Sequence, residues 1–202
     1  MTENSRPKIA AILLAAGAST RLGQPKQLLN FQGKTLLRRA AETLINSECS
    51  PIVVILGAEI AGSTAELSGL PVHFCINKDW ANGMSSSIKT GLDQIQETAP
   101  AIDGVVIALC DQPNISAADI DALINAFDTD DPQIVTAEYQ GTVGVPALFP
   151  QRFFENLLGL TGDKGARSLI QVESENVVTI RMESAAFDVD TAGDAEELKA
   201  RL

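Results

Sequence analysis

The chain has 202 residues, of which 45% are hydrophobic and 20% are charged. This composition is that of an ordinary globular protein and excludes a disordered or fibrous chain. The length predicts a single domain over residues 1–202, with a core large enough to need neither disulfides nor a structural metal. The formal net charge of −11 argues against a general nucleic-acid binder, because such proteins need a net basic face.

The longest apolar runs of the sequence have the length of strands. Ile9–Leu14 and Val105–Cys110 are far shorter than a bilayer span, and the first residues lack the pattern of an export signal. The three cysteines are widely spaced and form no CxxC pair, which fits a protein with reduced thiols. We therefore expect a cytoplasmic protein that binds neither a membrane nor nucleic acid.

Short apolar runs alternate with amphipathic stretches over the first half of the chain. The runs predict buried strands over Ile9–Leu14, Ile52–Leu56, Val72–Ile76 and Val105–Leu109. The stretches between them predict helices over Thr35–Asn46, Ala58–Leu67 and Ser85–Glu97. Near-continuous apolar strands separated by helices indicate a parallel sheet covered on both faces. We therefore predict an α/β fold with a doubly wound, mostly parallel, Rossmann-like sheet that binds ligands at the carboxyl ends of its strands.

The pattern becomes less regular after residue 111. A capping box, in which Asp119 stands three residues after Ser116, predicts a helix that continues to about Phe127. The elements predicted beyond it are a strand over Gln133–Tyr139, a turn or bulge over Gly141–Pro146, a short helix over Gln151–Leu158, strands over Val177–Arg181 and Ala186–Val189, and a closing helix from Thr191. The C-terminal third is thus expected to be an irregular part of the same domain.

The first predicted strand runs into a loop of small residues, Leu13–Lys26, with the sequence LLAAGASTRLGQPK. Small residues let a backbone approach a ligand closely, and successive N–H groups bind phosphate oxygens. Arg21 offers a planar fork of donors, and Lys26 offers a compact charge. The loop matches neither GxxxxGK[ST] nor GxGxxG, so its spacing alone leaves open an ordinary connection between a strand and a helix.

Three hydroxyl side chains, Ser85–Ser87, follow Trp80 at the start of a predicted helix. Serines at this position cap free backbone N–H groups, which is a purely structural role. The same hydroxyls and the helix N-terminus are also suited to a nucleotide. The sequence by itself leaves both interpretations open.

Three aspartates lie at positions that suit a metal bound with phosphates. Asp111 follows a buried strand and therefore lies at the carboxyl edge of the sheet, where Mg²⁺ could bind, although it could also shape the turn before Pro113. Asp188 and Asp190 lie on one side of an extended segment. Asp190 could alternatively cap the closing helix.

A basic segment with two glycines, GDKGAR, contains Lys164 and Arg167. It is suited to hold an anionic substrate, and it is equally compatible with a capped helix that has a solvated basic edge. His73, the only histidine, falls within a predicted strand, so neither a histidine-based catalytic triad nor a histidine-rich metal site is expected.

Five segments occur in one order along nearly the whole chain: LAAGASTRLGQPKQLL, WANGMSSSIKTGL, LCDQP, GDKGAR and DVDT. Together they resemble the nucleotidyltransferases of the molybdenum cofactor cytidylyltransferase type, with Leu22 where methionine is usual. The related guanylyltransferases for the same cofactor usually carry LAGG in the first loop. Ala16 adds a methyl group where they have glycine, and we hypothesise that it narrows the base site and favours a pyrimidine.

The resemblance also implies a role for individual residues. The implied nucleotide-binding residues are Leu14, Ala15, Ala16, Gly17, Arg21, Lys26, Ser85, Ser86 and Asp111. Arg21, Lys26 and Asp111 would be catalytic, while Asp111 and Asp190 would hold Mg²⁺. The residues that would bind the acceptor are Lys164, Arg167 and Asp188.

The activity that the resemblance implies joins CTP to molybdopterin-bound molybdenum. The products would be the cytosine dinucleotide form of the cofactor and pyrophosphate, and a molybdoenzyme that receives the cofactor would be a protein partner. Two alternatives remain open: transfer to a sugar or alditol phosphate, and a nucleotide-binding insertion chaperone without turnover. A dehydrogenase is disfavoured because GxGxxG is absent.

Overall fold

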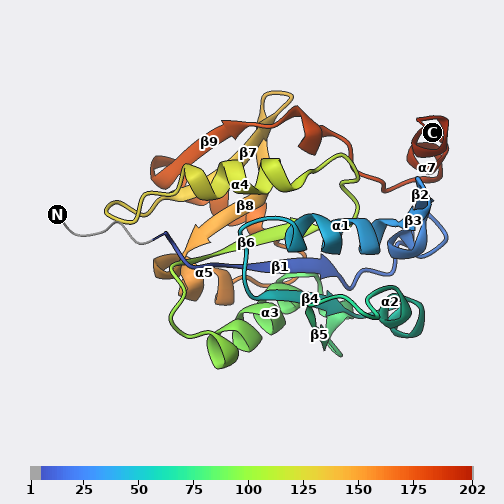
Figure 1. Ribbon diagram of the computed structural model, residues 1–202, viewed down its shortest axis with the longest axis horizontal. Coiled ribbons are helices and arrows are strands. Elements are labelled where there is room, and N and C mark those ends of the chain that lie inside the picture. The colour runs from blue at the N-terminus through green and yellow to red at the C-terminus, as the bar shows by residue number, and fades with distance from the viewer. Residues whose placement is uncertain (1–5, 202) are drawn as a thin grey trace.

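The computed structural model describes residues 6–201, which fold around a seven-stranded sheet (Figure 1). The strand order across the sheet is β5-β4-β1-β6-β8-β7-β9. The strands are β1 (Ile9–Ala15), β4 (Ile52–Leu56), β5 (His73–Ile76), β6 (Gly104–Leu109), β7 (Ile134–Tyr139), β8 (Thr142–Pro150) and β9 (Val177–Arg181). Only β8 runs antiparallel to its neighbours, so the predicted mostly parallel α/β fold is confirmed.

Helices cover both faces of this sheet. One apolar cluster joins the sheet to α1 (Leu36–Ile45) and α4 (Ala117–Asn125). A second cluster, on the other face, joins it to α3 (Met84–Thr98), α5 (Phe154–Leu158) and α6 (Ala166–Val172). The remaining helices are α2 (Ile60–Glu66), α7 (Ala192–Ala200) and the single-turn 3₁₀ helices η1 (Lys26–Leu28), η2 (Trp80–Asn82), η3 (Gln151–Phe153), η4 (Ser174–Asn176) and η5 (Glu183–Ala186). None of the helices within residues 6–201 is long and apolar enough to cross a membrane.

The helix α7 packs against residues 22–36. A short hairpin, β2 (Asn30–Phe31) and β3 (Lys34–Thr35), lies beside α7 at the right of Figure 1. A third apolar cluster fills this contact and includes Leu22, Phe31, Leu36, Val189, Ala195 and Leu198. The N–H of Val189 also donates to the carbonyl of Asp111 at 3.0 Å. These contacts bring the segment after η5 to the loops that follow β1 and β6.

The turn or bulge predicted over Gly141–Pro146 is confirmed, because Gly141 belongs to the turn before the nine-residue strand β8 and a bulge follows within that strand. The reversal is confined to Gln140 and Gly141, whose φ angles of 49° and 71° suit a two-residue hairpin turn. The pairing with β7 shifts register between Gly144 and Ala147, which leaves a bulge that contains a proline. A bulge tolerates proline because the extra residue needs no ladder hydrogen bond. Glycine and proline in this segment therefore mark a turn and a bulge, and β8 continues beyond the bulge to Pro150.

The strand predicted over Ala186–Val189 is wrong, since η5 ends at Ala186 and the following residues pair with no strand. Val189 is fully buried in the third apolar cluster, whereas Asp188 is exposed. This alternation imitates the period of a strand. The helix predicted from Thr191 is confirmed: Thr191 is its N-cap and forms a capping box with Asp194. The capping box of Ser116 with Asp119 is confirmed as well.

Gly83→Ala is expected to destabilise the protein because the start of α3 approaches another backbone. Gly83 has a φ of 101°, and an added Cβ would lie 2.4 Å from the carbonyl of Gly162. We expect the free energy of unfolding, measured by urea denaturation, to fall by about 3 kcal/mol. Gly69→Ala is the matched control, because Gly69 has a φ of 77° but open space around its Cα. The control should cost only about 1 kcal/mol, and equal losses would contradict the close backbone contact.

Candidate active site

The carboxyl ends of β1 and β6 meet at the centre of the sheet, where the chain order reverses. Such a switch point is where open α/β sheets bind ligands. A cavity of about 400 Å³ lies at this edge, and we call it the first cavity. Among the residues predicted to bind a nucleotide, those that line it are Leu14, Ala15, Ala16, Gly17, Lys26 and Asp111.

Lys26 connects two aspartates at the mouth of this region. Its ammonium nitrogen donates to Oδ2 of Asp111 and to Oδ1 of Asp190, the latter at 2.8 Å. Nη2 of Arg21 donates to Oδ2 of Asp190, also at 2.8 Å. Asp111 is 5% exposed, and the side chain of Lys26 is 19% exposed. The structure thus brings together four of the predicted site residues, which come from three distant parts of the chain.

The opposite charges of this cluster each favour the ionised form of the other. Burial alone would lower the pKa of Lys26, but the attraction of Asp111 and the hydrogen bonds to Asp111 and Asp190 raise it above the ordinary lysine value. Burial alone would raise the pKa of Asp190, but the hydrogen bond and charge of Lys26, with those of Arg21, lower it. The lysine is therefore charged and Asp190 ionised at neutral pH.

The two aspartates fit a divalent cation. Both carboxylates converge on one positive charge, and Oδ1 of Asp111 is buried without a hydrogen-bond partner. Carboxylate oxygens are the donors that Mg²⁺ prefers. Among residues 6–201, no group of three or more histidine, cysteine or acidic side chains is assembled for a metal. Asp111 and Asp190 would therefore hold Mg²⁺ together with ligands from phosphates and water, as is usual for this ion.

A second cavity, of about 260 Å³, adjoins the first and shares Leu14, Met84, Leu109 and Asp163 with it. Two of the residues predicted to bind the acceptor, Arg167 and Asp188, line this second cavity. Asp188 lies at its rim, with its side chain open to solvent, yet desolvation by the surrounding protein and the charges of Asp111 and Asp190 raise its pKa to about 6. The cavity thus presents both a cation and a carboxylate next to the cluster of Lys26.

Some of the predicted site residues lie elsewhere. The hydroxyl of Ser85 donates to the carbonyl of Gly162 at 2.8 Å, and that of Ser86 lies 2.8 Å from the carbonyl of Gly83. Neither serine lines either cavity, whereas Ser87 lines the first. Lys164 is exposed and lines neither cavity. The hydroxyls of Ser85 and Ser86 therefore bind backbone carbonyls at the start of α3, and the predicted capping of its N–H groups is wrong, because the N-cap is Gly83 and no side chain caps this helix.

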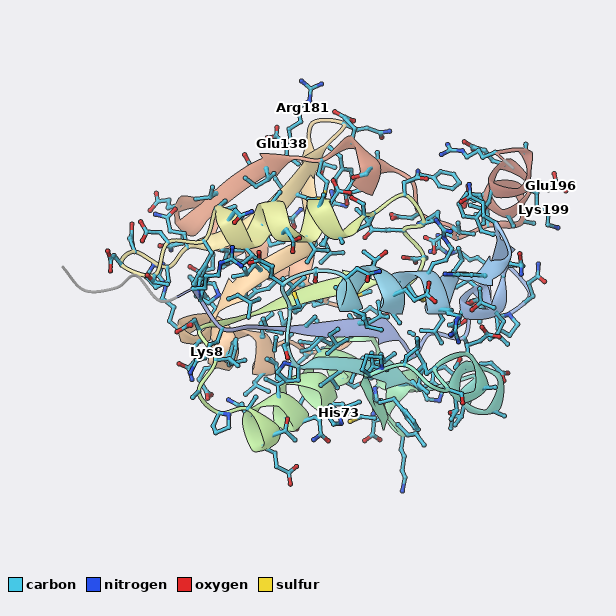
Figure 2. All side chains as sticks on the ribbon, in the orientation of Figure 1. Lys8, His73, Glu138, Arg181, Glu196 and Lys199 are labelled. Atoms are coloured by element: carbon cyan, nitrogen blue, oxygen red, sulfur yellow. The ribbon has the colours of Figure 1, made fainter. Side chains whose placement is uncertain are left out.

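Other residues at the site were not singled out from the sequence. Gln27 and Trp80 line the first cavity, and Gln112 and Tyr139 line the second. Gln27 and Trp80 both lie within motifs quoted above. Their closeness in sequence to Lys26 and Ser85 was the signal that could have identified them. Tyr139 lies at the end of β7, whose position next to β8 no local pattern indicates. Figure 2 shows His73 on the edge strand β5, and it lines neither cavity.

Residues 11–178 match the family model described as the MobA-like NTP transferase domain. The chain belongs to this family. It is a nucleotidyltransferase, as the five motifs led us to expect.

Several curated relatives are similar over different shares of the chain. The purine catabolism protein PucB of Bacillus subtilis is 27% identical over 97% of this chain and 98% of its own. A probable molybdenum cofactor guanylyltransferase of Bacillus cereus is 28% identical over 91% of this chain and 88% of its own. The nicotine blue oxidoreductase of Paenarthrobacter nicotinovorans is 36% identical over 61% of this chain, and the match spans only 59% of that relative.

Solved structures agree with the fold. A homologue of Mycobacterium tuberculosis Rv0371c, from Mycobacterium sp. strain JC1, is 32% identical and superposes with a TM-score of 0.84 over 96% of both chains. Rv0371c itself, solved in complex with manganese, is 26% identical with a TM-score of 0.81 over 96% of this chain and 100% of its own. A nucleotidyl transferase from Methanothermobacter shares the fold, with 18% identity and a TM-score of 0.80 over 96% of this chain and 97% of its own.

Lys26→Met is expected to destabilise the folded protein, because it leaves the buried carboxylate of Asp111 without its cation. We expect the free energy of unfolding in urea to fall by about 3 kcal/mol. The double variant Lys26→Met/Asp111→Asn should recover much of this loss, since it removes the uncompensated charge. Lys164→Met is the control, because Lys164 is exposed and outside both cavities. A loss as small as that of the control would contradict the importance of the ion pair.

Proposed function

We propose that this nucleotidyltransferase joins CTP to molybdopterin-bound molybdenum, giving the cytosine dinucleotide form of the cofactor and pyrophosphate. Support for the acceptor comes from the relatives named molybdenum cofactor guanylyltransferase, which are similar over nearly the whole chain. Support for the reaction comes from the five motifs and from the family. We also propose that it works in the cytoplasm and that a molybdoenzyme receives the product.

The observation that carries the proposal is the position of the Lys26 cluster between two cavities. Asp111 lines the first cavity and Asp188 lines the second. Lys26 hydrogen-bonds to Asp111 and Asp190, and the charges of this cluster act on Asp188. A nucleotide in the first cavity and a phosphorylated acceptor in the second would meet at this cluster. Transfer between two such anions needs alignment and charge neutralisation more than any other assistance.

The side chains of the site suit this chemistry. The N–H groups of the loop after β1 would bind the phosphates of CTP, with Lys26 and Arg21 adding positive charge as pyrophosphate leaves. The acceptor phosphate has a second pKa of about 6, so it is largely dianionic and attacks without a strong general base. Arg167 would hold this phosphate in the second cavity. No histidine is required.

Mg²⁺ at Asp111 and Asp190 would supply further positive charge to the triphosphate. Support for a divalent cation comes from the unpartnered oxygen of Asp111 and from the manganese in the structure of Rv0371c. The tasks of this chain are to hold the two carboxylates at one point and to keep Lys26 beside them. Both tasks follow from the ion pairs within the cluster.

Ala16 is proposed to favour a pyrimidine base. It is buried, lines the first cavity, and carries the methyl group that the LAGG loops lack. A cavity narrowed by one methyl group discriminates against a larger base by a modest factor. The preference for CTP over GTP is therefore expected to depend on this position.

Asp111→Asn is expected to abolish transfer without unfolding the protein. The test measures pyrophosphate release from CTP and Mg²⁺ with the molybdenum cofactor as acceptor. We expect turnover to fall by about a thousandfold, since the variant removes one fixed charge from the cluster. Activity near that of the wild type would show that Asp111 takes no part in the reaction.

The same assay separates the alternative functions. Pyrophosphate release only with a sugar or alditol phosphate would show that such a compound, and not the molybdenum cofactor, is the acceptor. Tight CTP binding without any pyrophosphate release would indicate an insertion chaperone. Activity with the molybdenum cofactor excludes both as the main function.

Ala16→Gly is expected to weaken the preference for CTP. The ratio of kcat/KM for CTP to that for GTP should fall by about tenfold, because the variant removes the methyl group from the base site. Ala18→Gly is the control, since it lines the same cavity and adds the same backbone freedom. Equal ratios in both variants would contradict the role of Ala16.

A further inference from the structure

Gln27 is a buried amide next to the most important cation of the site. It follows Lys26 in the single-turn helix η1 and is 1% exposed. Burying an amide is unfavourable unless its polar atoms find partners. The partners of Gln27 therefore indicate what its side chain holds.

All of these partners lie at the end of β1 or in the loop that follows it. Nε2 of Gln27 donates to the carbonyl of Ala15 at 3.0 Å and to the carbonyl of Gly17 at 2.7 Å. The hydroxyl of Ser19 lies 3.4 Å from Oε1 of Gln27 and accepts from the N–H of Lys26 at 3.1 Å. One side chain thus fixes three positions of a five-residue stretch, 15–19.

The stretch has a backbone conformation that needs such support. Ser19 has a φ of 54°, in the left-handed region that residues other than glycine rarely adopt. Its carbonyl accepts from the N–H groups of Leu22 and Gly23, at 3.0 and 3.1 Å. Strained conformations of this kind persist only where neighbouring contacts hold them. Gln27 supplies several of those contacts.

The hydrogen bonds to Gln27 also set the direction of the loop's N–H groups. In a trans peptide the carbonyl and the following N–H point in opposite directions. Because Gln27 holds the carbonyls of Ala15 and Gly17, the N–H groups of Ala16 and Ala18 point away from it. Within residues 6–201, the N–H groups of residues 17–21 donate to no acceptor of the protein. A run of free N–H groups in such a loop is suited to phosphate oxygens.

We propose that Gln27 is a positioning residue that holds the loop after β1 in the conformation that receives the triphosphate. It acts through the carbonyls of Ala15 and Gly17 and through the hydroxyl of Ser19. This role rests on the proposed function, because it assumes that the first cavity binds a nucleotide. It adds to that function a residue that binds neither the metal nor the base.

Gln27→Met tests the role, since methionine keeps a similar length but can neither donate nor accept these hydrogen bonds. Binding of CTP with Mg²⁺ is measured by calorimetry, with the fluorescence of Trp80 as a second readout. Trp80 is the only tryptophan and lines the same cavity. We expect the Kd and the KM for CTP to rise by about tenfold. Binding of Mn²⁺ alone should stay unchanged, because Asp111 and Asp190 are untouched.

Thr136→Val is the matched control. Thr136 is fully buried and lines neither cavity, and its hydroxyl donates to the carbonyl of Gly144 at 2.6 Å. The control therefore removes a buried hydrogen bond from a side chain to the backbone without touching the loop. Its Kd for CTP should equal that of the wild type. Equal changes in the two variants, or no change in Gln27→Met, would show that Gln27 is merely structural.

A second variant covers the case in which Gln27→Met fails to fold. Gln27→Asn keeps a buried amide but is shorter by one carbon–carbon bond, so it no longer reaches both carbonyls. We expect its Kd for CTP to rise by about threefold, and an unchanged Kd would overturn the positioning role.

The wild type separates the two proposals. If it binds none of the four common nucleoside triphosphates with Mg²⁺, the proposed function fails and the positioning role fails with it. If it binds CTP and Gln27→Met binds it equally well, only the positioning role fails.

Discussion

The site depends on one ammonium group that lies between two carboxylates. Without the charge of Lys26, Asp111 and Asp190 would repel each other, and Asp111 would be a buried carboxylate without a cation. The two carboxylates raise the pKa of Lys26 despite its burial, so its ammonium group stays charged at neutral pH. The same arrangement leaves one oxygen of Asp111 free, so the cluster is stable in itself and still has capacity for a divalent ion.

The fold brings these charges together by three different routes. Lys26 comes from the loop after β1 and Asp111 from the end of β6, two adjacent parallel strands whose carboxyl ends must lie at one edge. Asp190 belongs to neither strand. It is held there by the third apolar cluster and by the hydrogen bond from Val189 to Asp111. Apolar packing beside the site therefore fixes the position of a charged group within it.

Much of this could be predicted from the sequence, because uniform apolar runs identify buried strands and place Asp111 at the edge of the sheet. The sequence was less decisive where two physical causes give the same local pattern. Gly141–Pro146 suggested a turn or a bulge, and it contains the end of a turn followed by a bulge within β8. The alternation in Ala186–Val189 suggested a strand but comes from packing without pairing. The prediction for Ser86 failed for a different reason, because its hydroxyl hydrogen-bonds to a backbone carbonyl and lines neither cavity. The role of Gln27 depends on contacts that no spacing reveals.

The position of Asp190 has a consequence for how local order in one segment reaches the site. All seven strands of the main sheet end by Arg181, so the segment of Asp190 and α7 adds no strand to it. The cluster nevertheless needs this segment, because the apolar contacts around α7 hold Asp190 in place. Local opening of α7 would therefore leave the sheet intact and take from Lys26 one of its two counter-charges.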